Sequence, residues 1–143
     1  MSAVNHSAVG VRFIVTSFIF FILAGLLALA IRLQLALPGL DLVSPEAFNQ
    51  FFTVHGTAMM FLFAIPMLEG LGIYLTPLMI GCRDMAFPRL NAFGYWMYAI
   101  GGTILFLAFF TGRAPDAGWF NYTPLSSSGF SPSPTDVTVM GLG

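Results

Sequence analysis

The sequence predicts an all-α membrane protein, because its composition leaves too few charged residues to cover a water-soluble surface. Of its 143 residues, 57% are hydrophobic and only 8% are charged. A soluble domain keeps about a quarter of its residues charged. Three apolar stretches are each long enough to cross a bilayer core, which takes about 20 helical residues. We therefore expect one unit, residues 1–143, with three transmembrane helices and the start of a fourth.

The three predicted spans cover residues 13–36, 51–80 and 90–111. Pro66 interrupts the second span. Helices in lipid tolerate a proline where neighbouring helices pack closely. It removes one backbone hydrogen bond, so we expect the second helix to be disturbed there.

After the third span, residues 112–135 are rich in Gly, Pro and Ser and carry Trp119, Phe120 and Tyr122. Aromatic side chains of this kind anchor protein segments at the membrane surface. The pattern predicts an ordered external loop. From Asp136 the chain turns apolar again, which predicts the beginning of a further helix.

The basic residues indicate an orientation. Arg12, Arg83 and Arg89 flank one membrane face and Arg113 flanks the other. Short loops rich in Arg and Lys stay on the cytoplasmic or matrix side, so the amino terminus is expected inside. The net charge of -1 provides no basic field for nucleic acid, and no nucleic-acid partner is expected.

His55 is the sharpest candidate for chemistry, because an ionisable group within a span is costly to bury. Its neighbours are apolar apart from Thr53 and Thr57. A neutral imidazole there could ligate haem iron through one nitrogen while its other N–H donates to a carbonyl. Gly56 would let a flat macrocycle approach the helix. The alternative is a structural histidine that is hydrogen-bonded to a neighbouring helix.

Arg32 lies near the same membrane face as His55 if the first two spans pack antiparallel. Its guanidinium could donate to a formyl or propionate oxygen of a haem and raise the potential of the iron. Alternatively, the side chain extends from the helix end to the lipid headgroups.

Three further residues are candidates for proton transfer. Glu69 follows His55 by fourteen residues and faces nearly the same interior, where it could relay protons or bond a neighbouring helix. Asp84 lies in the loop after the second span, and Asn91 begins the third. A carboxylate at a channel mouth can collect protons and an asparagine can hold the first water, although an ordinary solvated loop has the same composition.

With these residues in place, the chain resembles the amino-terminal part of the catalytic subunit I of haem-copper oxygen reductases, the cytochrome c oxidase family. The firmest matching stretches are Phe52–Phe61 and Pro77–Asn91. Arg32 and the Gly118–Trp119 pair extend the likeness towards both ends. The resemblance implies the first part of a twelve-helix bundle.

The resemblance also implies roles for individual residues. His55 would be an axial ligand of the low-spin haem, and Arg32 would bond its formyl group, which implies haem a. Trp119 would touch a haem propionate. Asp84 would stand at the entrance of the D proton pathway, with Asn91 just inside it.

For the whole protein, the resemblance implies electron transfer from cytochrome c to oxygen, which is reduced to water with proton uptake. The second axial histidine, the high-spin haem ligand and the copper ligands would lie beyond Gly143, because the chain has only two histidines. The implied partners are the remaining helices of subunit I, subunits II and III, and cytochrome c. The location would be an energy-transducing membrane, either the bacterial plasma membrane or the mitochondrial inner membrane.

Several positions depart from the family pattern. Ile73 and Ala92 stand where the D pathway usually has asparagines, and an apolar side chain cannot order channel water. Ser7 stands where a Lys commonly follows the first histidine.

Positions that distinguish the quinol-oxidising branch favour cytochrome c as the electron donor. Leu23, Leu27 and Ala47 replace the polar residues of that branch, although Gln50 matches it. Three alternatives remain: a quinol-oxidising member, a haem-free scaffold or assembly fragment, and a proton or ion conductor built around Glu69 and Asp84.

Overall fold

The computed structural model describes residues 4–40 and 42–126, and all regular structure in these ranges is helical. The elements are α1 (His6–Gln34), α2 (Pro45–Thr57), the π-helix η1 (Ala58–Ala64), α3 (Ile65–Ile80) and α4 (Pro88–Phe110). α2, η1 and α3 join into one 36-residue helix, so three helices are long and apolar enough to cross a membrane. The predicted all-helical fold with three spans is confirmed. The expected start of a fourth helix lies outside the described residues.

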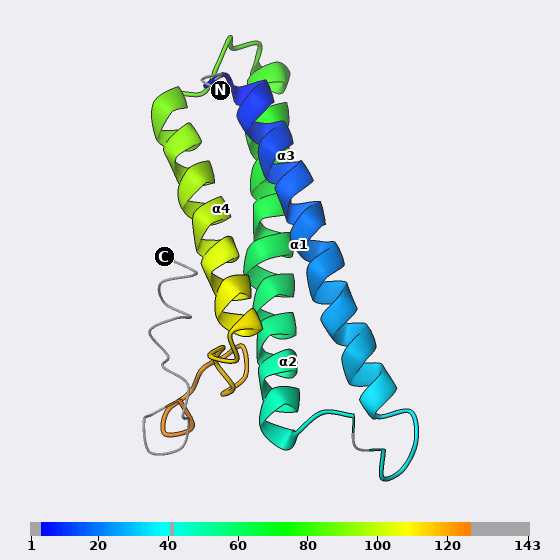
Figure 1. Cartoon of the computed structure of the whole chain (residues 1–143). Helices are drawn as coiled ribbons and strands as arrows, with labels where there is room; N and C mark the ends of the chain where they lie inside the picture. The colour runs from blue at the N-terminus through cyan, green and yellow to red at the C-terminus, as the bar shows by residue number, and fades with distance from the viewer. Residues whose placement is uncertain (1–3, 41, 127–143) are drawn as a thin grey trace.

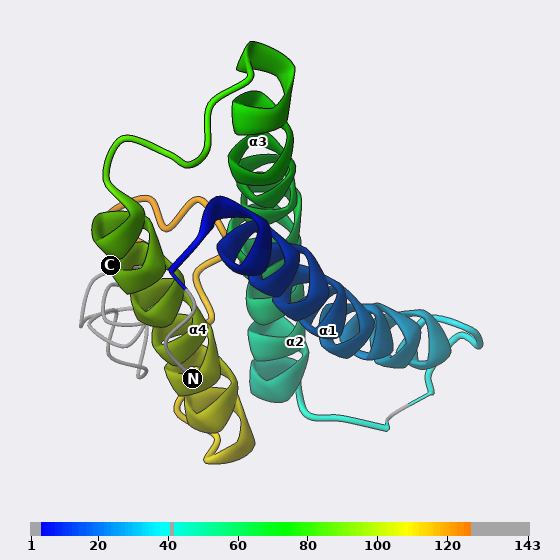
Figure 2. The ribbon, with the colours of Figure 1, turned by 90° about the horizontal axis from the view of Figure 1, so that it is seen from above.

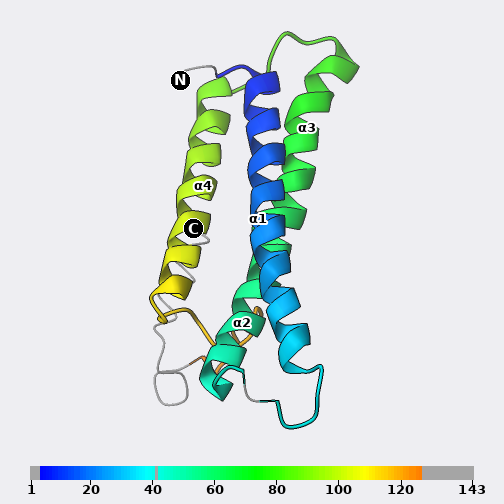
Figure 3. The same cartoon turned by 45° about the vertical axis from the view of Figure 1, so that its right-hand side comes forward.

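Each long helix runs antiparallel to the long helix that precedes it in the chain (Figure 1). One end of the bundle, which we call the amino end, carries the start of α1 and the α3–α4 loop. The opposite end carries the α1–α2 loop and residues 111–126, and we call it the aromatic end. α1 crosses the long α2–η1–α3 helix obliquely, as Figure 3 shows. Seen from above, the axes of the three helices diverge from one another (Figure 2).

Local signals in the sequence explain several helix ends. The Ser44 side chain accepts a hydrogen bond from the Ala47 amide at 3.2 Å, and Pro45 occupies the first position of α2. Pro88 begins α4 in the same way. α3 ends at Gly81, whose positive φ of 72° lets the chain turn out of the helix.

Two buried clusters form the core. The cluster at the amino end contains Val9, Phe13, Ile73 and Ala92. The cluster towards the aromatic end draws on all three long helices and on the loop that follows α4, and its members are Phe20, Ala24, Leu27, Val54, Ala58, Leu62, Leu105, Phe106 and Ala114. Only 22–28% of the most apolar part of each span is buried, so most of the apolar surface is available to lipid or to further helices.

α1 and α3 approach each other closely where Gly10 faces Gly70. A Cβ on Gly10 would lie 2.8 Å from the Gly70 carbonyl oxygen, and a Cβ on Gly70 would lie 2.8 Å from the Phe13 Cβ. Both distances are far below van der Waals contact and involve atoms that cannot rotate away. Glycine at both positions therefore sets the spacing of the two helices, as small residues do in membrane bundles.

The disturbance expected at Pro66 takes the form of the π-helical segment before it. The Ile65 amide donates to the Met60 carbonyl five residues back, and the helix continues without a break. In a regular α-helix the amide of residue 66 would donate to the Leu62 carbonyl, but proline has no N–H. The Tyr98 hydroxyl of α4 donates to that carbonyl at 2.7 Å. A side chain on another helix thus satisfies an acceptor that would otherwise lack a partner in lipid.

The glycine contact yields a matched pair of variants. Gly70→Ala should force α1 and α3 apart and lower the free energy of unfolding by about 1–3 kcal/mol, the usual cost of overpacking. Gly72→Ala is the control, because a Cβ there meets no described atom within 4 Å. Thermal unfolding of the full-length protein in detergent measures both. Equal unfolding midpoints for the two variants would contradict the proposed role of the crossing.

Candidate functional site

His55 lies near the end of α2 and faces α1. Its Nδ1 lies 2.9 Å from the Ala24 carbonyl oxygen. A carbonyl can only accept, so the imidazole donates from Nδ1. The proton is thereby placed on Nδ1, and the lone pair of the neutral ring is on Nε2. The expected bond to a neighbouring helix and a free ligating nitrogen therefore coexist in one side chain.

Nothing in the described part of the chain occupies the second nitrogen. Among residues 4–40 and 42–126, no hydrogen-bond partner contacts His55 Nε2, and the ring is half-buried. In the same ranges, no three His, Cys, Asp or Glu side chains gather into a metal-binding group. What this segment offers to an iron atom is thus a single oriented imidazole, which is the arrangement of a metal-bound histidine with a carbonyl behind it.

Trp119 packs on Gly56, which follows His55 in the sequence. A Cβ on Gly56 would lie 3.1 Å from the Trp119 Cβ and 3.2 Å from its Cδ1. The expectation that the bare backbone at Gly56 faces a macrocycle is therefore wrong, because the Trp119 side chain covers it. Trp119 remains 44% exposed, so much of its indole is free to contact another group.

A hydrogen bond between the loop and α2 holds Trp119 in place. The Gly118 amide donates to Thr53 Oγ1 at 2.9 Å, and Thr53 donates in turn to the Asn49 carbonyl at 2.8 Å. Thr53 is 1% exposed, and Ala114 and Ala117 of the loop are equally buried. The described part of the predicted aromatic loop is packed into the bundle, and residues 127–135 of that prediction lie outside the described residues.

Arg32 lies in the last turn of α1 and is exposed. It follows Ala24 by eight residues, about 12 Å along the helix axis. Antiparallel packing predicted that Arg32 and His55 lie at a similar depth. Because His55 is level with Ala24, Arg32 instead lies nearer the aromatic end than His55 does.

At the amino end, Asp84 receives two backbone hydrogen bonds. The amides of His6 and Met85 donate to Asp84 Oδ1 at 2.9 Å and 2.8 Å. The Asn5 side chain makes no capping bond, so Asp84 caps α1 from the α3–α4 loop. Its side chain is 30% exposed, and His6 Nδ1 lies 3.6 Å from the carboxylate. Asn91 lies half-buried in the first turn of α4.

The two apolar departures from the family pattern lie in the same buried cluster. Ile73 is 6% exposed and Ala92 is 9% exposed, and both pack with Val9 and Phe13. Met85, next to Asp84, packs against this cluster. The path directly inward from Asp84 into the three-helix core is therefore apolar.

Glu69 lies on α3 between the two core clusters. It lines a cavity of about 440 Å³ together with Tyr98 of α4 and Phe13 of α1. Glu69 is exposed, and it forms no ion pair with any of the described residues.

Comparison with known proteins assigns the family. The sequence profile of the family described as "Cytochrome C and Quinol oxidase polypeptide I" matches residues 8–143. The chain belongs to this family. With its three membrane-spanning helices, it is an integral membrane protein.

Individual relatives agree with this assignment. The chain is 51% identical over 140 residues to a putative cytochrome c oxidase subunit 1-beta of Streptomyces coelicolor, covering 96% of this chain and 24% of that protein. It is 47% identical to cytochrome c oxidase subunit 1 of Corynebacterium efficiens over all of this chain and 25% of that one. It is 50% identical to cytochrome c oxidase subunit 1 of Synechocystis sp., covering 86% of this chain and 22% of that one. The chain thus spans about a quarter of the length of these relatives.

Four partners of the site residues were not foreseen from the sequence. The Ala24 carbonyl and the Gly118 amide are backbone groups, and no sequence pattern marks them. The contact of His6 with Asp84 joins residues 78 positions apart. Tyr98 had a signal: Pro66 within a span leaves a carbonyl that requires a donor from another helix.

Thr53→Val should loosen the loop that carries Trp119. Valine has the same shape but cannot accept from the Gly118 amide, and leaving a buried amide without a partner costs about 1–3 kcal/mol. Hydrogen exchange of the peptide covering residues 112–126, measured by mass spectrometry, should become about ten-fold faster or more. Thr53→Ser keeps the acceptor and should behave like the parent protein. Unchanged exchange in Thr53→Val would show that the loop is held by other contacts.

Proposed function

We propose that this chain is the amino-terminal part of the catalytic subunit of a terminal oxidase, in which His55 is an axial ligand of a low-spin haem. The observation that carries the proposal is the bond from His55 Nδ1 to the Ala24 carbonyl. It fixes the ring on α1 and leaves the Nε2 lone pair available. The family assignment supports haem as the group that uses it.

When bound, the haem would take up and pass on one electron at a time. The chain's own residues hold and orient it. His55 would supply one ligand, Trp119 would provide an exposed indole that packs on the neighbouring Gly56, and Arg32 would provide five N–H donors from the last turn of α1. A planar guanidinium suits a formyl or propionate oxygen, and a formyl partner for Arg32 would make the group haem a.

Cytochrome c is the proposed electron donor, and oxygen, reduced to water, the acceptor. Leu27 is buried in the core, and Leu23 packs against the same cluster. These two positions offer no polar side chain to a quinol head group, which supports cytochrome c over quinol. The high-spin haem, the copper and their ligands belong to the remaining helices of subunit I, with subunits II and III as further partners.

The amino end is proposed to face the inside of an energy-transducing membrane, either the bacterial plasma membrane or the mitochondrial inner membrane. In this orientation Asp84 stands at the inner surface, partly exposed, where it can take up protons. Asn91 lies in the first turn of α4 behind it and can hold a water molecule. The two residues are the proposed start of a proton uptake route.

The ligand assignment is tested by His55→Ala in the assembled complex. The variant should lose the low-spin haem band from the reduced-minus-oxidised visible spectrum, because no other side chain replaces the imidazole. His6→Ala is the matched control, since it removes the chain's other histidine and should leave the band in place. Membrane insertion of the chain, followed by immunoblot of washed membranes, should be unchanged in both variants. A full low-spin band in His55→Ala would refute the assignment and favour a haem-free scaffold.

The uptake role is tested by Asp84→Asn, which keeps an oxygen to cap α1 but cannot carry a proton. Proton uptake by the purified complex, followed with a pH-sensitive dye after mixing the reduced enzyme with oxygen, should slow about ten-fold or more. The thermal midpoint should change little because the capping bonds persist. Uptake at the parent rate would show that protons enter elsewhere.

A further inference from the structure

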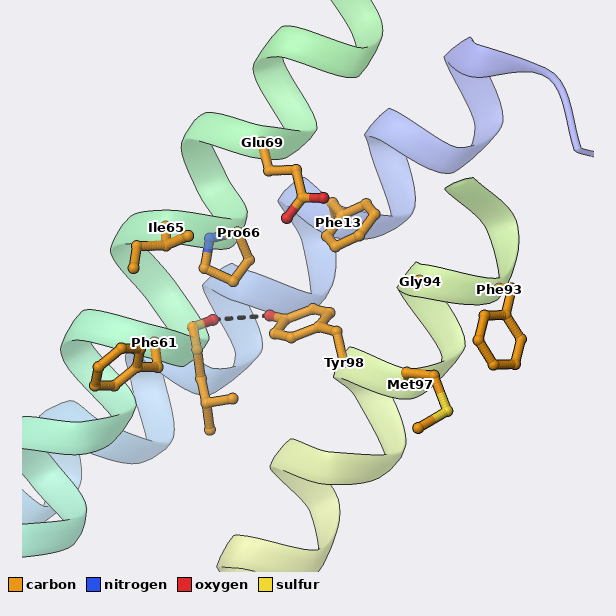
Figure 4. Close-up of a pocket in the computed structure, with 10 residues that line it drawn as sticks. Phe13, Phe61, Ile65, Pro66, Glu69, Phe93, Gly94, Met97 and Tyr98 are labelled. Atoms are coloured by element: carbon orange, nitrogen blue, oxygen red, sulfur yellow. Dashed lines mark hydrogen bonds between the residues drawn. The ribbon is translucent and has the colours of Figure 1, made fainter. Parts of the chain in front are cut away.

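The cavity beside Glu69 has a buried apolar floor and an exposed rim. Phe13 and Leu62, each 2% exposed, belong to the floor. Phe61, Phe93 and Met97 form the exposed rim, with exposed fractions between 37% and 60%. Figure 4 shows the Glu69 carboxylate extending from α3 into the space between the helices, near the Phe13 ring. The cavity therefore lies between η1, α3 and α4, and α1 contributes Phe13 to its floor.

Only two of the ten lining residues can titrate, Glu69 and Tyr98. α1 contributes Phe13, and none of the lining residues is a Lys, Arg or His. An isolated carboxylate at this depth in a membrane protein is expensive unless it is protonated, hydrated or paired. No cation of the described residues lines the cavity, so within this segment water and a proton are what can stabilise the carboxylate.

Tyr98 provides a fixed polar partner for such water. Its hydroxyl proton is committed to the Leu62 carbonyl at 2.7 Å, so its oxygen is left to accept from a water molecule. Glu69 follows Leu62 by seven residues, about 10 Å along the axis, which a chain of about three waters spaced about 2.8 Å apart can bridge. The cavity volume of about 440 Å³ is more than ten times the roughly 30 Å³ that one water occupies in the liquid.

The same face of α4 leads back to the amino end. Asn91, Gly94 and Tyr98 recur at positions i, i+3 and i+7, so they lie along one stripe of the helix. Gly94 lines the cavity, and a Cβ there would meet no described atom within 4 Å. The apolar cluster of Ile73 and Ala92 closes the inner side of the cavity, because Phe13 belongs to both and Tyr98 packs against that cluster. Gly94 lies on the exposed side. A chain of water molecules can therefore follow this stripe of α4 past the apolar cluster.

We infer that this cavity, which is open on the side where Glu69 is exposed, is a water-holding proton site, in which Glu69 takes a proton from water and returns it to water while Tyr98 orients the chain of waters. The inference rests on the proposed function, since the protons would be those consumed in oxygen reduction. Glu69 and Tyr98 would thus order water for proton transfer. The apolar side chains of Ile73 and Ala92, which are packed into the core, cannot do this.

The test uses the purified native complex with Glu69→Gln, which keeps the shape and removes the proton-carrying group. Proton uptake in the dye assay should slow about ten-fold or more relative to the parent. Glu46→Gln is the matched control, because it removes an exposed carboxylate in the first turn of α2, far from the cavity, and should leave uptake unchanged.

Infrared difference spectroscopy gives a second readout that does not depend on turnover. The reduced-minus-oxidised spectrum of the parent should contain a protonated-carboxyl band that shifts in heavy water. The band should be absent in Glu69→Gln and shifted in Glu69→Asp. If Glu69→Gln does not assemble, the Glu69→Asp spectrum decides the matter, because an unshifted band would overturn the inference.

The outcomes separate this inference from the proposed function. A normal low-spin haem band with parent-like proton uptake and carboxyl bands in Glu69→Gln overturns the inference alone. Glu69 would then have no part in proton uptake. Absence of the low-spin haem band from the spectrum of the parent complex would refute the proposed function.

Discussion

The packing of α1 along the long α2–η1–α3 helix is the constraint on which the rest of the structure depends. At the amino end the two helices touch backbone to backbone, because Gly10 and Gly70 carry no side chains to separate them. Towards the aromatic end the Ala24 carbonyl meets the His55 ring. The packing of this one helix pair therefore sets the helix spacing at the amino end and, towards the aromatic end, the tautomer and direction of the candidate ligand.

A second rule, the need to pair every polar group in lipid, explains how the third span and the loop are attached. Tyr98 of α4 supplies the donor that Pro66 withdraws from Leu62. Thr53 Oγ1 accepts a hydrogen bond from the Gly118 amide, and this bond holds the neighbouring Trp119 against α2. Groups that stabilise the fold thus also shape the surroundings of His55 and Glu69. We expect mutations at these bonds to affect stability and function together.

The sequence predicted the helical class and the number of spans well, because hydropathy and helix length depend only on local composition. It also singled out His55, Arg32, Glu69 and Asp84, since an ionisable side chain stands out in or beside an apolar stretch. Their surroundings were harder to foresee. The partner of His55 is a backbone carbonyl 31 residues away, and Gly56 faces Trp119. Such contacts arise from tertiary packing, which hydropathy does not encode.

The central claim is that His55 ligates a low-spin haem in a terminal oxidase. It is tested most directly by the reduced-minus-oxidised visible spectrum of the detergent-purified native complex, recorded with and without carbon monoxide. The account predicts a low-spin haem band that carbon monoxide leaves unchanged, together with a high-spin haem that binds carbon monoxide. A complex that contains this chain but shows no haem absorption would contradict the account.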